Sequence, residues 1–419
     1  MKERSTLQPF APGDVFVGST VLEGGDDDHA GRGRILQYDA DLRRKGVLWL
    51  SQTTHLVGGL RFDREGRLWA FDSQAFVVLT VEQDGTVRTR DFGARPFSNV
   101  TFASDGSLYL AEHVAGNGIK MEIQARMGTR LQKMPGTDRL GDGHVWHFRA
   151  DGTLLRELPT EVHGGIGGFM GVTMSALSPD ETTLVYCSET GSRLMRYDLE
   201  SARQLPDLQC IPEGEREMFF AMDYAPDGRL YVSRGTRVDL VAPDGRTMCC
   251  YPLEGHGWAT LKTAADGRHL YVGNFFTGRI VKLELGTGEH VAIADTGMPR
   301  SLAGIAQFAG RARSRTRAAA QLDSARRSRT RGATQPESRR SARSRSVTQA
   351  ESHGRTRSGR TARRPSPSGS SKRRKAKKHS KSAAARSSGA RTKKPGRPST
   401  PRKANSSGKP QRAKSPRRR

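Results

Sequence analysis

Residues 222–234 run Met-Asp-Tyr-Ala-Pro-Asp-Gly-Arg-Leu-Tyr-Val-Ser-Arg, and variants of this stretch recur along the first three quarters of the chain. Apolar and polar residues alternate on both sides of an Asp-Gly dipeptide, a pattern that predicts two antiparallel strands joined by a tight turn. The turn glycines Gly66 and Gly106 are 40 residues apart, and Gly228 and Gly267 are 39 apart. This period is typical of four-stranded propeller blades. The other copies lie at 60–70, 100–111, 175–186 and 259–272.

A second hairpin follows each copy, so the pattern predicts five complete blades. Three further strands near the N-terminus, at 15–19, 34–39 and 46–50, lack an innermost partner, and Leu302–Phe308 has the pattern of that missing strand. Joining both ends in one blade closes the ring and removes an exposed strand edge. We therefore expect an all-β, closed six-bladed β-propeller over residues 11–310, preceded by an N-terminal extension, residues 1–10.

The charge of the chain is divided unevenly. Of its 70 Lys and Arg residues, 37 fall after Gly310, together with only three of the 43 acidic residues. The propeller is therefore slightly acidic, and residues 311–419 form a strongly basic tail. Residues 311–352 contain three 14-residue repeats, and the whole tail has almost no large apolar residues whose burial could offset the entropy of ordering it. We expect the tail to be disordered.

The hairpin pattern, Φ-x-x-x-x-Asp-Gly-x-Leu-Tyr-Val, followed by 189–193 and 274–279, resembles the NHL-repeat and SMP-30/gluconolactonase group of six-bladed propellers. In gluconolactonase-type members the resemblance implies a metal held by a first-blade Glu, by Asn residues at innermost-strand entries and by a later Asp. Only Asn99 in this sequence stands where such a metal ligand is expected. Met174-Ser175 stands in place of an Asn-Gly pair, and Phe219-Phe220 stands in place of the later Asp. No Glu-Gly-Pro occurs near Val15. Lyase members of the NHL group use histidines at the channel mouth, which favours His55 and His256.

The loops that enter the innermost strands open on one face of a propeller, where ligands commonly bind. Counting back from the turn glycines places His55, Arg95, Glu217 and His256 there. We predict catalytic roles for His55, His256 and Glu217, and a divalent metal, Ca or Zn, held by Glu112, Glu189 and Asn99. The alternative is that this mouth is polar because it is wet, and that its acids cap loop amides.

Two long loops, 19–33 and 114–143, lie on the same predicted face. Loops of this length are commonly functional or mobile, so we expect them to form a cover over the channel mouth. The first contains Asp26-Asp-Asp28-His29, for which a solvated acidic loop is the simpler interpretation.

The tail predicts affinity for a polyanion, most commonly nucleic acid. Its Gly396-Arg-Pro398 core resembles an AT-hook, and Ser366, Thr400 and Ser415 precede prolines as in linker-histone-like tails. RNA, an anionic membrane, a purely solubilising role and docking on the acidic propeller remain alternatives. The predicted nucleic-acid-binding residues are Lys372, Arg373, Arg374, Lys375, Lys377, Lys378, Lys393, Lys394, Gly396, Arg397 and Pro398.

The leading hypothesis is a ligand- or partner-binding propeller tethered to nucleic acid by its tail, with DNA as the expected partner. The alternative is an SMP-30/NHL-like hydrolase or lyase that acts on a small molecule at the channel mouth. Four cysteines without metal-ligand spacing, and no apolar run near Met1 or of transmembrane length, favour an intracellular protein, cytoplasmic, nucleoid-associated or nuclear. We expect the propeller to be monomeric.

Overall fold

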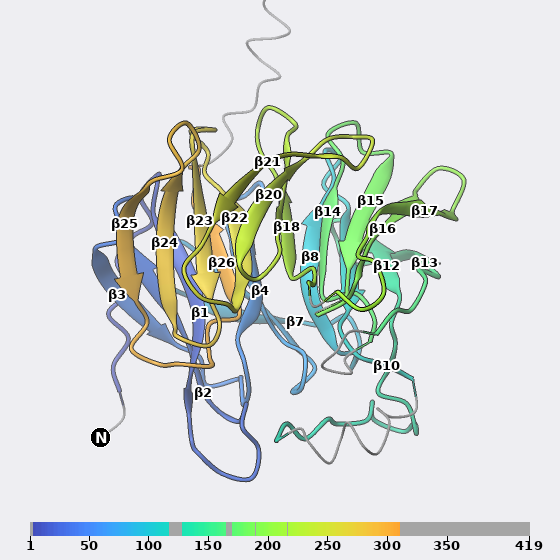
Figure 1. The fold of residues 1–419 in the computed structure, drawn as a ribbon. Helices are drawn as coiled ribbons and strands as arrows, with labels where there is room; N and C mark the ends of the chain where they lie inside the picture. Colours follow the sequence, from blue (N-terminus) through green and yellow to red (C-terminus); the bar gives the residue numbers. More distant parts are fainter. Residues whose placement is uncertain (1–2, 117–127, 165–169, 189, 216, 311–419) are drawn as a thin grey trace, which may run out of the picture. The chain divides into compact units, whose positions relative to one another are not determined.

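A computed structural model describes residues 3–116, 128–164, 170–188, 190–215 and 217–310. These residues form six four-stranded antiparallel sheets arranged as the blades of a β-propeller (Figure 1), as the hairpin repeat predicts. From the innermost strand outward, the first three blades are β26 (Gly304–Gln307), β1 (Val15–Leu22), β2 (Gly31–Tyr38), β3 (Arg44–Trp49); β4 (Gly58–Phe62), β5 (Leu68–Asp72), β6 (Val77–Val81), β7 (Val87–Arg90); and β8 (Phe97–Phe102), β9 (Leu108–Glu112), β12 (Val145–Phe148), β13 (Leu154–Leu158).

The other three blades follow the chain without insertion. They are β14 (Met174–Leu177), β15 (Thr183–Cys187), β16 (Arg193–Asp198), β17 (Arg203–Cys210); β18 (Ala221–Tyr224), β19 (Leu230–Ser233), β20 (Arg237–Val241), β21 (Thr247–Pro252); and β22 (Trp258–Thr263), β23 (His269–Asn274), β24 (Arg279–Glu284), β25 (His290–Asp295). A short ribbon, β10 (Ala115–Gly116) with β11 (Gly141–Asp142), lies within the long insertion of the third blade.

The repeated hairpin forms the two inner strands of each of the five continuous blades, as predicted. In the fifth, β18 pairs with β19 from Ala221 opposite Ser233 to Tyr224 opposite Leu230. Gly228 has a φ of 86°, which a residue without a Cβ adopts at no steric cost, and the Asp227 carboxylate accepts the backbone N–H of Arg229. The fourth blade has Glu181 in the place of the glycine, at a φ of 60°.

The two ends of the propeller meet in one blade, as predicted. β26 pairs with β1 from Val15 opposite Gln307 to Gly18 opposite Gly304. In Figure 1 the last strand of the propeller lies beside the first strands of the chain. Ile305, Ala306 and Phe308 are buried in the cores that join this blade to its neighbours. The first blade is thus built from both ends of the described chain.

No helix in the described ranges has the length and apolar character that crossing a bilayer requires. Residues 311–419, for which the sequence predicts disorder, lie outside the described residues.

Candidate functional site

The central channel has two ends that differ in composition. At the strand-entry end the six innermost strands β26, β4, β8, β14, β18 and β22 begin, and the long loops after β1 and β9 lie on this side. At the turn end the innermost strands finish and the hairpin turns follow. The sequence pointed to the strand-entry end. Of the candidate residues that the structure describes, His55, Glu112, Glu217 and His256 belong to that end, and Asn99 lies within β8.

His55 is buried at the strand-entry end beside an acidic loop. Its Nε2 lies 3.2 Å from Asp27 Oδ2, and its Nδ1 lies 2.8 Å from the hydroxyl of Thr54. The backbone N–H groups of Thr54 and His55 both donate to the buried Asp72 carboxylate, at 2.8 and 2.9 Å. Asp72 therefore caps the backbone amides of the loop that carries His55. This is the structural role that the sequence also allows for the acidic residues of the channel mouth.

Glu112 occupies the equivalent place in the third blade and is fully buried. Its carboxylate accepts the N–H groups of Asp142 and Gly143, each at 2.7 Å, and pairs with the Arg95 guanidinium at 2.7 Å. Arg95 also bonds Asp142 at 2.8 Å and lies over the ring of Trp146. The carboxylate of Glu112, a predicted metal ligand, can accept about four hydrogen bonds. Three protein donors already bind it.

Glu217, predicted to be catalytic, lies within an ion-pair network of the fifth blade. Arg237 donates to both its carboxylate oxygens, at 2.6 and 2.9 Å, and Arg234 donates at 2.5 Å. Asp239, almost fully buried, pairs with both arginines. Hydrogen bonding by Arg237 lowers the pKa of Glu217 against the opposing effect of burial, which favours the ionised carboxylate.

The remaining predicted residues have separate surroundings. Asn99 is buried between two blades, where its amide donates to the Thr173 carbonyl at 2.7 Å and accepts from Ser175 Oγ at 2.8 Å. His256 is exposed, with its ring 5.4 Å from that of Phe276. Glu189 lies outside the described residues. Within the described residues, no hydrogen bond, ion pair or ring contact joins His55, His256 and Glu217 to one another, so their shared catalytic role stays a prediction.

The two long loops meet at the strand-entry end. The hydroxyl of Thr129 lies 2.7 Å from Asp28 Oδ1 and 2.5 Å from His29 Nδ1, and the N–H of Arg130 donates to Asp27 at 3.2 Å. Asp27, Asp28 and His29 each offer a ligand atom within 4.8 Å of the others. The described part of the second loop therefore touches the first, as a cover requires, while residues 117–127 lie outside the described residues.

A pocket of about 490 Å³ occupies the turn end of the channel. Its walls come from the last residues of all six innermost strands and from the turns that follow them, and Gly310 lies at its edge. Phe62, Leu177, Tyr224 and Phe308 provide apolar surface. This volume is within the range of small-molecule sites, 300–1,000 Å³.

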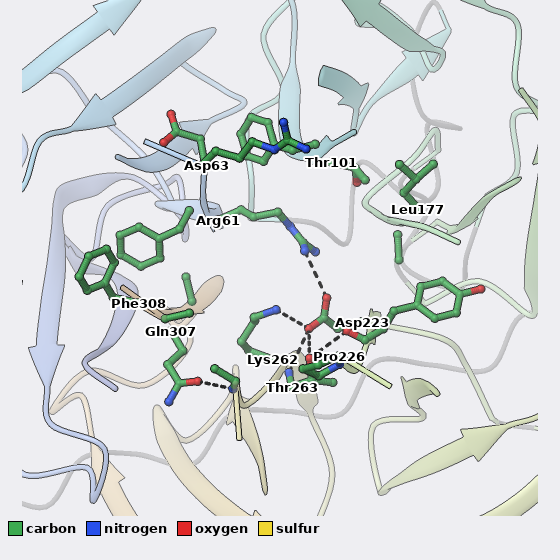
Figure 2. A pocket seen from close by; sticks show the side chains of 18 of the residues that line it. Arg61, Asp63, Thr101, Leu177, Asp223, Pro226, Lys262, Thr263, Gln307 and Phe308 are labelled. Atoms are coloured by element: carbon green, nitrogen blue, oxygen red, sulfur yellow. Dashed lines mark hydrogen bonds and ion pairs between the residues drawn. The ribbon is translucent and has the colours of Figure 1, made fainter. Parts of the chain in front are cut away.

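Three charged side chains from three blades meet in this pocket. Figure 2 shows Arg61 and Lys262 converging on Asp223. Arg61 reaches Asp223 Oδ1 at 3.2 Å from the second blade, and Lys262 reaches Oδ2 at 2.6 Å from the sixth. The N–H and hydroxyl of Thr263 add bonds of 3.0 and 2.6 Å to Oδ2. Arg61 and Lys262 are 24% and 22% exposed, whereas Asp223 is 3% exposed.

The electrostatics of this cluster favour a carboxylate. Burial by itself raises the pKa of Asp223, but the charges of Lys262 and Arg61 outweigh it and lower that pKa to about 2. Burial lowers the pKa of Lys262, which the Asp223 carboxylate opposes. Asp63, also at the pocket, is directed elsewhere: it binds Arg67 at 2.6 Å and the indole N–H of Trp69 at 2.9 Å.

Sequence reasoning missed this cluster, although a signal exists. Arg61, Asp223 and Lys262 each stand five residues before the turn glycine of their blade, as Thr101 does in the third. The structure shows that this position of the repeat points into the channel. Ala176 has the equivalent place in the fourth blade, so three of five such inward positions carry a charge. This is unusual for a packed strand and would have identified the cluster.

Together these features define a six-bladed β-propeller with a charged pocket at one end of its channel. No protein-family model and no curated protein matches the sequence. A chain in the crystal structure of a nidogen/laminin complex is similar with a TM-score of 0.48 and 11% identity, covering 70% of this chain and 98% of that one. A streptogramin B lyase structure is similar with a TM-score of 0.37 and 12% identity, covering 68% and 75%. Similarity this low supports no statement about activity.

Proposed function

We propose that this protein is a binding propeller whose ligand occupies the channel pocket at the turn end and whose basic C-terminal segment holds it on DNA. The observation that carries the binding role is the pocket of about 490 Å³, in which two cations and one carboxylate meet among apolar walls. Apolar surface with a few convergent polar groups is what small-molecule sites have in common.

The DNA-binding role is supported by the division of charge. The 37 Lys and Arg residues after Gly310 far outnumber the three acids there, whereas the propeller is acidic. Cations that neutralise phosphates release condensed counterions, and this release drives binding at low salt. The described propeller closes its own ring before residue 310, so a chain that ends at Gly310 keeps every described strand.

DNA binding tests the second role. The full chain and a chain ending at Gly310 are titrated with a fluorescent DNA duplex between 50 and 200 mM salt. We expect the full chain to lose about a thousandfold in affinity or more over this range, as proteins with six or more phosphate contacts do. The shorter chain should bind negligibly at every salt concentration. Equal binding by both chains would contradict the proposal, and preference for an RNA duplex would reassign the partner.

A hydrolase or lyase is the second candidate, favoured by the cluster at the strand-entry end. The side chains of Asp27, Asp28 and His29 supply two carboxylates and an imidazole, and these donor groups suit a divalent ion. His55 forms a hydrogen bond with Asp27. A bound ion would supply Lewis-acid polarisation of a substrate oxygen. Arg300, 3.3 Å from Asp28, and Arg130, 2.8 Å from Asp26, already offset part of this negative charge.

Metal analysis of the full chain tests this candidate. After dialysis against Zn²⁺ or Ca²⁺, the enzyme hypothesis predicts about one equivalent of ion per chain, lost in both Asp28→Asn and His55→Ala. His256→Ala, which changes an exposed histidine that has no contact with the cluster among the described residues, should retain the ion if the metal lies at Asp27–His29. A metal-free protein with unchanged stability in all three variants would leave only the binding role.

A further inference from the structure

We propose that the ligand of the channel pocket is a small organic anion with an apolar body, held by Arg61 and Lys262 beside Asp223. This inference rests on the proposed binding role of the propeller and names the chemistry of its ligand. It does not depend on the role of the basic segment.

The first argument is the charge balance of the pocket. Arg61 and Lys262 share a single carboxylate, Asp223, and Asp63 is engaged by Arg67 outside the cluster. One positive charge therefore stays uncompensated among the described residues that meet at the centre of the channel. Both cations still reach water, and a ligand that covered them would have to compensate this charge, because burying an unpaired charge is costly.

The second argument is the number of free donors. Arg61 carries five N–H groups and Lys262 three, and among the described residues each donates one hydrogen bond, to Asp223. Both side chains line the pocket and are about one quarter exposed. The Asp223 carboxylate fixes their positions, so the remaining donors are already arranged for a second anionic group. Charge-assisted bonds from an arginine fork and an ammonium are the strong contacts of carboxylate and phosphate sites.

The third argument is the shape of the pocket beyond this cluster. Phe62, Phe308, Tyr224 and Leu177 line the space around the cations. Arg61 and Lys262 also line a second, very small cavity of about 10 Å³ deeper in the channel, so they lie at the inner limit of the large pocket. A ligand would thus place its anionic group at the cations and its apolar body toward the turn end.

Matched fluorinated probes test the proposal. We would measure binding of 4-fluorobenzoate, 4-fluorophenyl phosphate and 4-fluorobenzamide to the full chain by ¹⁹F NMR at pH 7. Because the basic segment attracts anions by itself, every comparison is between full-length proteins with identical residues 311–419. The carboxylate and the phosphate ester distinguish the two possible anionic groups, and the amide is the neutral isostere.

We expect at least one anion to bind tenfold or more tightly than the amide. Arg61→Gln and Lys262→Gln should each weaken that anion about tenfold, whereas Arg268→Gln, an exposed residue at the turn end that does not line the pocket, should change it less than threefold. Asp223→Asn removes the competing carboxylate and should strengthen anion binding by the folded protein. A purely structural ion cluster would not produce this increase.

The outcomes separate the inference from the binding role on which it rests. Equal affinity for the amide and the anions, sensitive to Phe62→Ala, would keep the pocket as a binding site and overturn the anionic ligand. Anion binding that is the same in Arg61→Gln, Lys262→Gln and wild type would assign it to the basic segment and overturn the inference. Folded protein that binds none of the three probes would overturn both.

Discussion

Asp223 shows how a single residue of the repeat can join distant blades. It lies in the fifth blade and binds Arg61 of the second and Lys262 of the sixth, so its carboxylate ties blades together across the channel. Its equivalents in the third and fourth blades, Thr101 and Ala176, carry no charge. The charged cluster therefore depends on the residues at three particular positions, and the repeated hairpin by itself does not produce it.

Asp223→Asn should lower the free energy of unfolding by about 2–3 kcal/mol. Removing one partner from a buried ion pair typically costs about 3–5 kcal/mol, and the cost is smaller here because both cations reach water. Denaturant titration of the full chain measures the change. Glu254→Gln, in a pair that is 90% exposed on the acid side, is the control and should change stability by less than about 0.5 kcal/mol. Equal effects of the two substitutions would contradict the structural role of the cluster.

The buried His113 predicts an acid-sensitive fold. Burial, followed by the charge of His29, lowers the pKa of His113 to about 4. An unfolded histidine titrates near pH 6.5, so between pH 6.5 and 4 the unfolded chain binds a proton that the folded chain does not. The free energy of unfolding should therefore fall as the pH drops through this range, by up to about 3 kcal/mol.

Denaturant titrations at pH 7 and pH 4.5 measure this loss. His113→Gln should make the two values more similar, since the substituted side chain does not titrate. His290→Gln replaces an exposed histidine and should leave the difference as it is in the wild type. If His113→Gln retains the full difference, the acid sensitivity has another origin.

At the scale of the strand, closure of the ring depends on β26. Leu302, Ile305 and Phe308 are each 5% exposed or less, and burial of such side chains contributes about 1.5–3 kcal/mol apiece. Their sum is comparable to the whole stability of a typical domain, about 5–15 kcal/mol. Without β26, β1 would also present an unpaired edge.

A chain ending at Ser301 should therefore fail to fold stably and should aggregate, whereas a chain ending at Gly310 should unfold at the temperature of the full-length propeller. Differential scanning calorimetry and size-exclusion chromatography compare the two. A soluble, cooperatively unfolding chain without β26 would show that closure is dispensable.

The strands were predictable because their signals are local. Alternation and Asp-Gly turns fix each hairpin, and the unpaired segments at the two ends predicted the closing strand. The ribbon of β10 and β11 was not predicted, because a pair of two-residue strands within a long insertion has no periodicity. The pocket was missed because the side chains that meet inside the ring come from residues far apart in the sequence. Arg61 and Asp223, for example, are 162 positions apart.

For the whole molecule, the predicted AT-hook-like core gives a test of DNA preference. Arg397→Ala in the full chain should remove preference for an A·T-rich over a G·C-rich duplex, because an arginine in the narrow minor groove reads that shape. Arg391→Ala removes the same charge outside the motif and should weaken binding to both duplexes equally. Competition binding at fixed salt measures both variants. The same loss of preference in Arg391→Ala would show that the tail binds DNA only through its positive charge and that the AT-hook-like core has no specific role.

The closing strand also determines how the molecule responds to mechanical load. β26 is the last strand before the basic segment, and the pair of Val15 and Gln307 lies at its C-terminal end. A pull on the chain beyond Gly310 would first reach the backbone hydrogen bonds that join Phe308 to Gly13 and Asp14, and then this pair. These bonds would break one after another instead of sharing the force. If the basic segment is held on DNA as proposed, tension along it would therefore open the ring at the seam between its two ends, while the five continuous blades stayed folded.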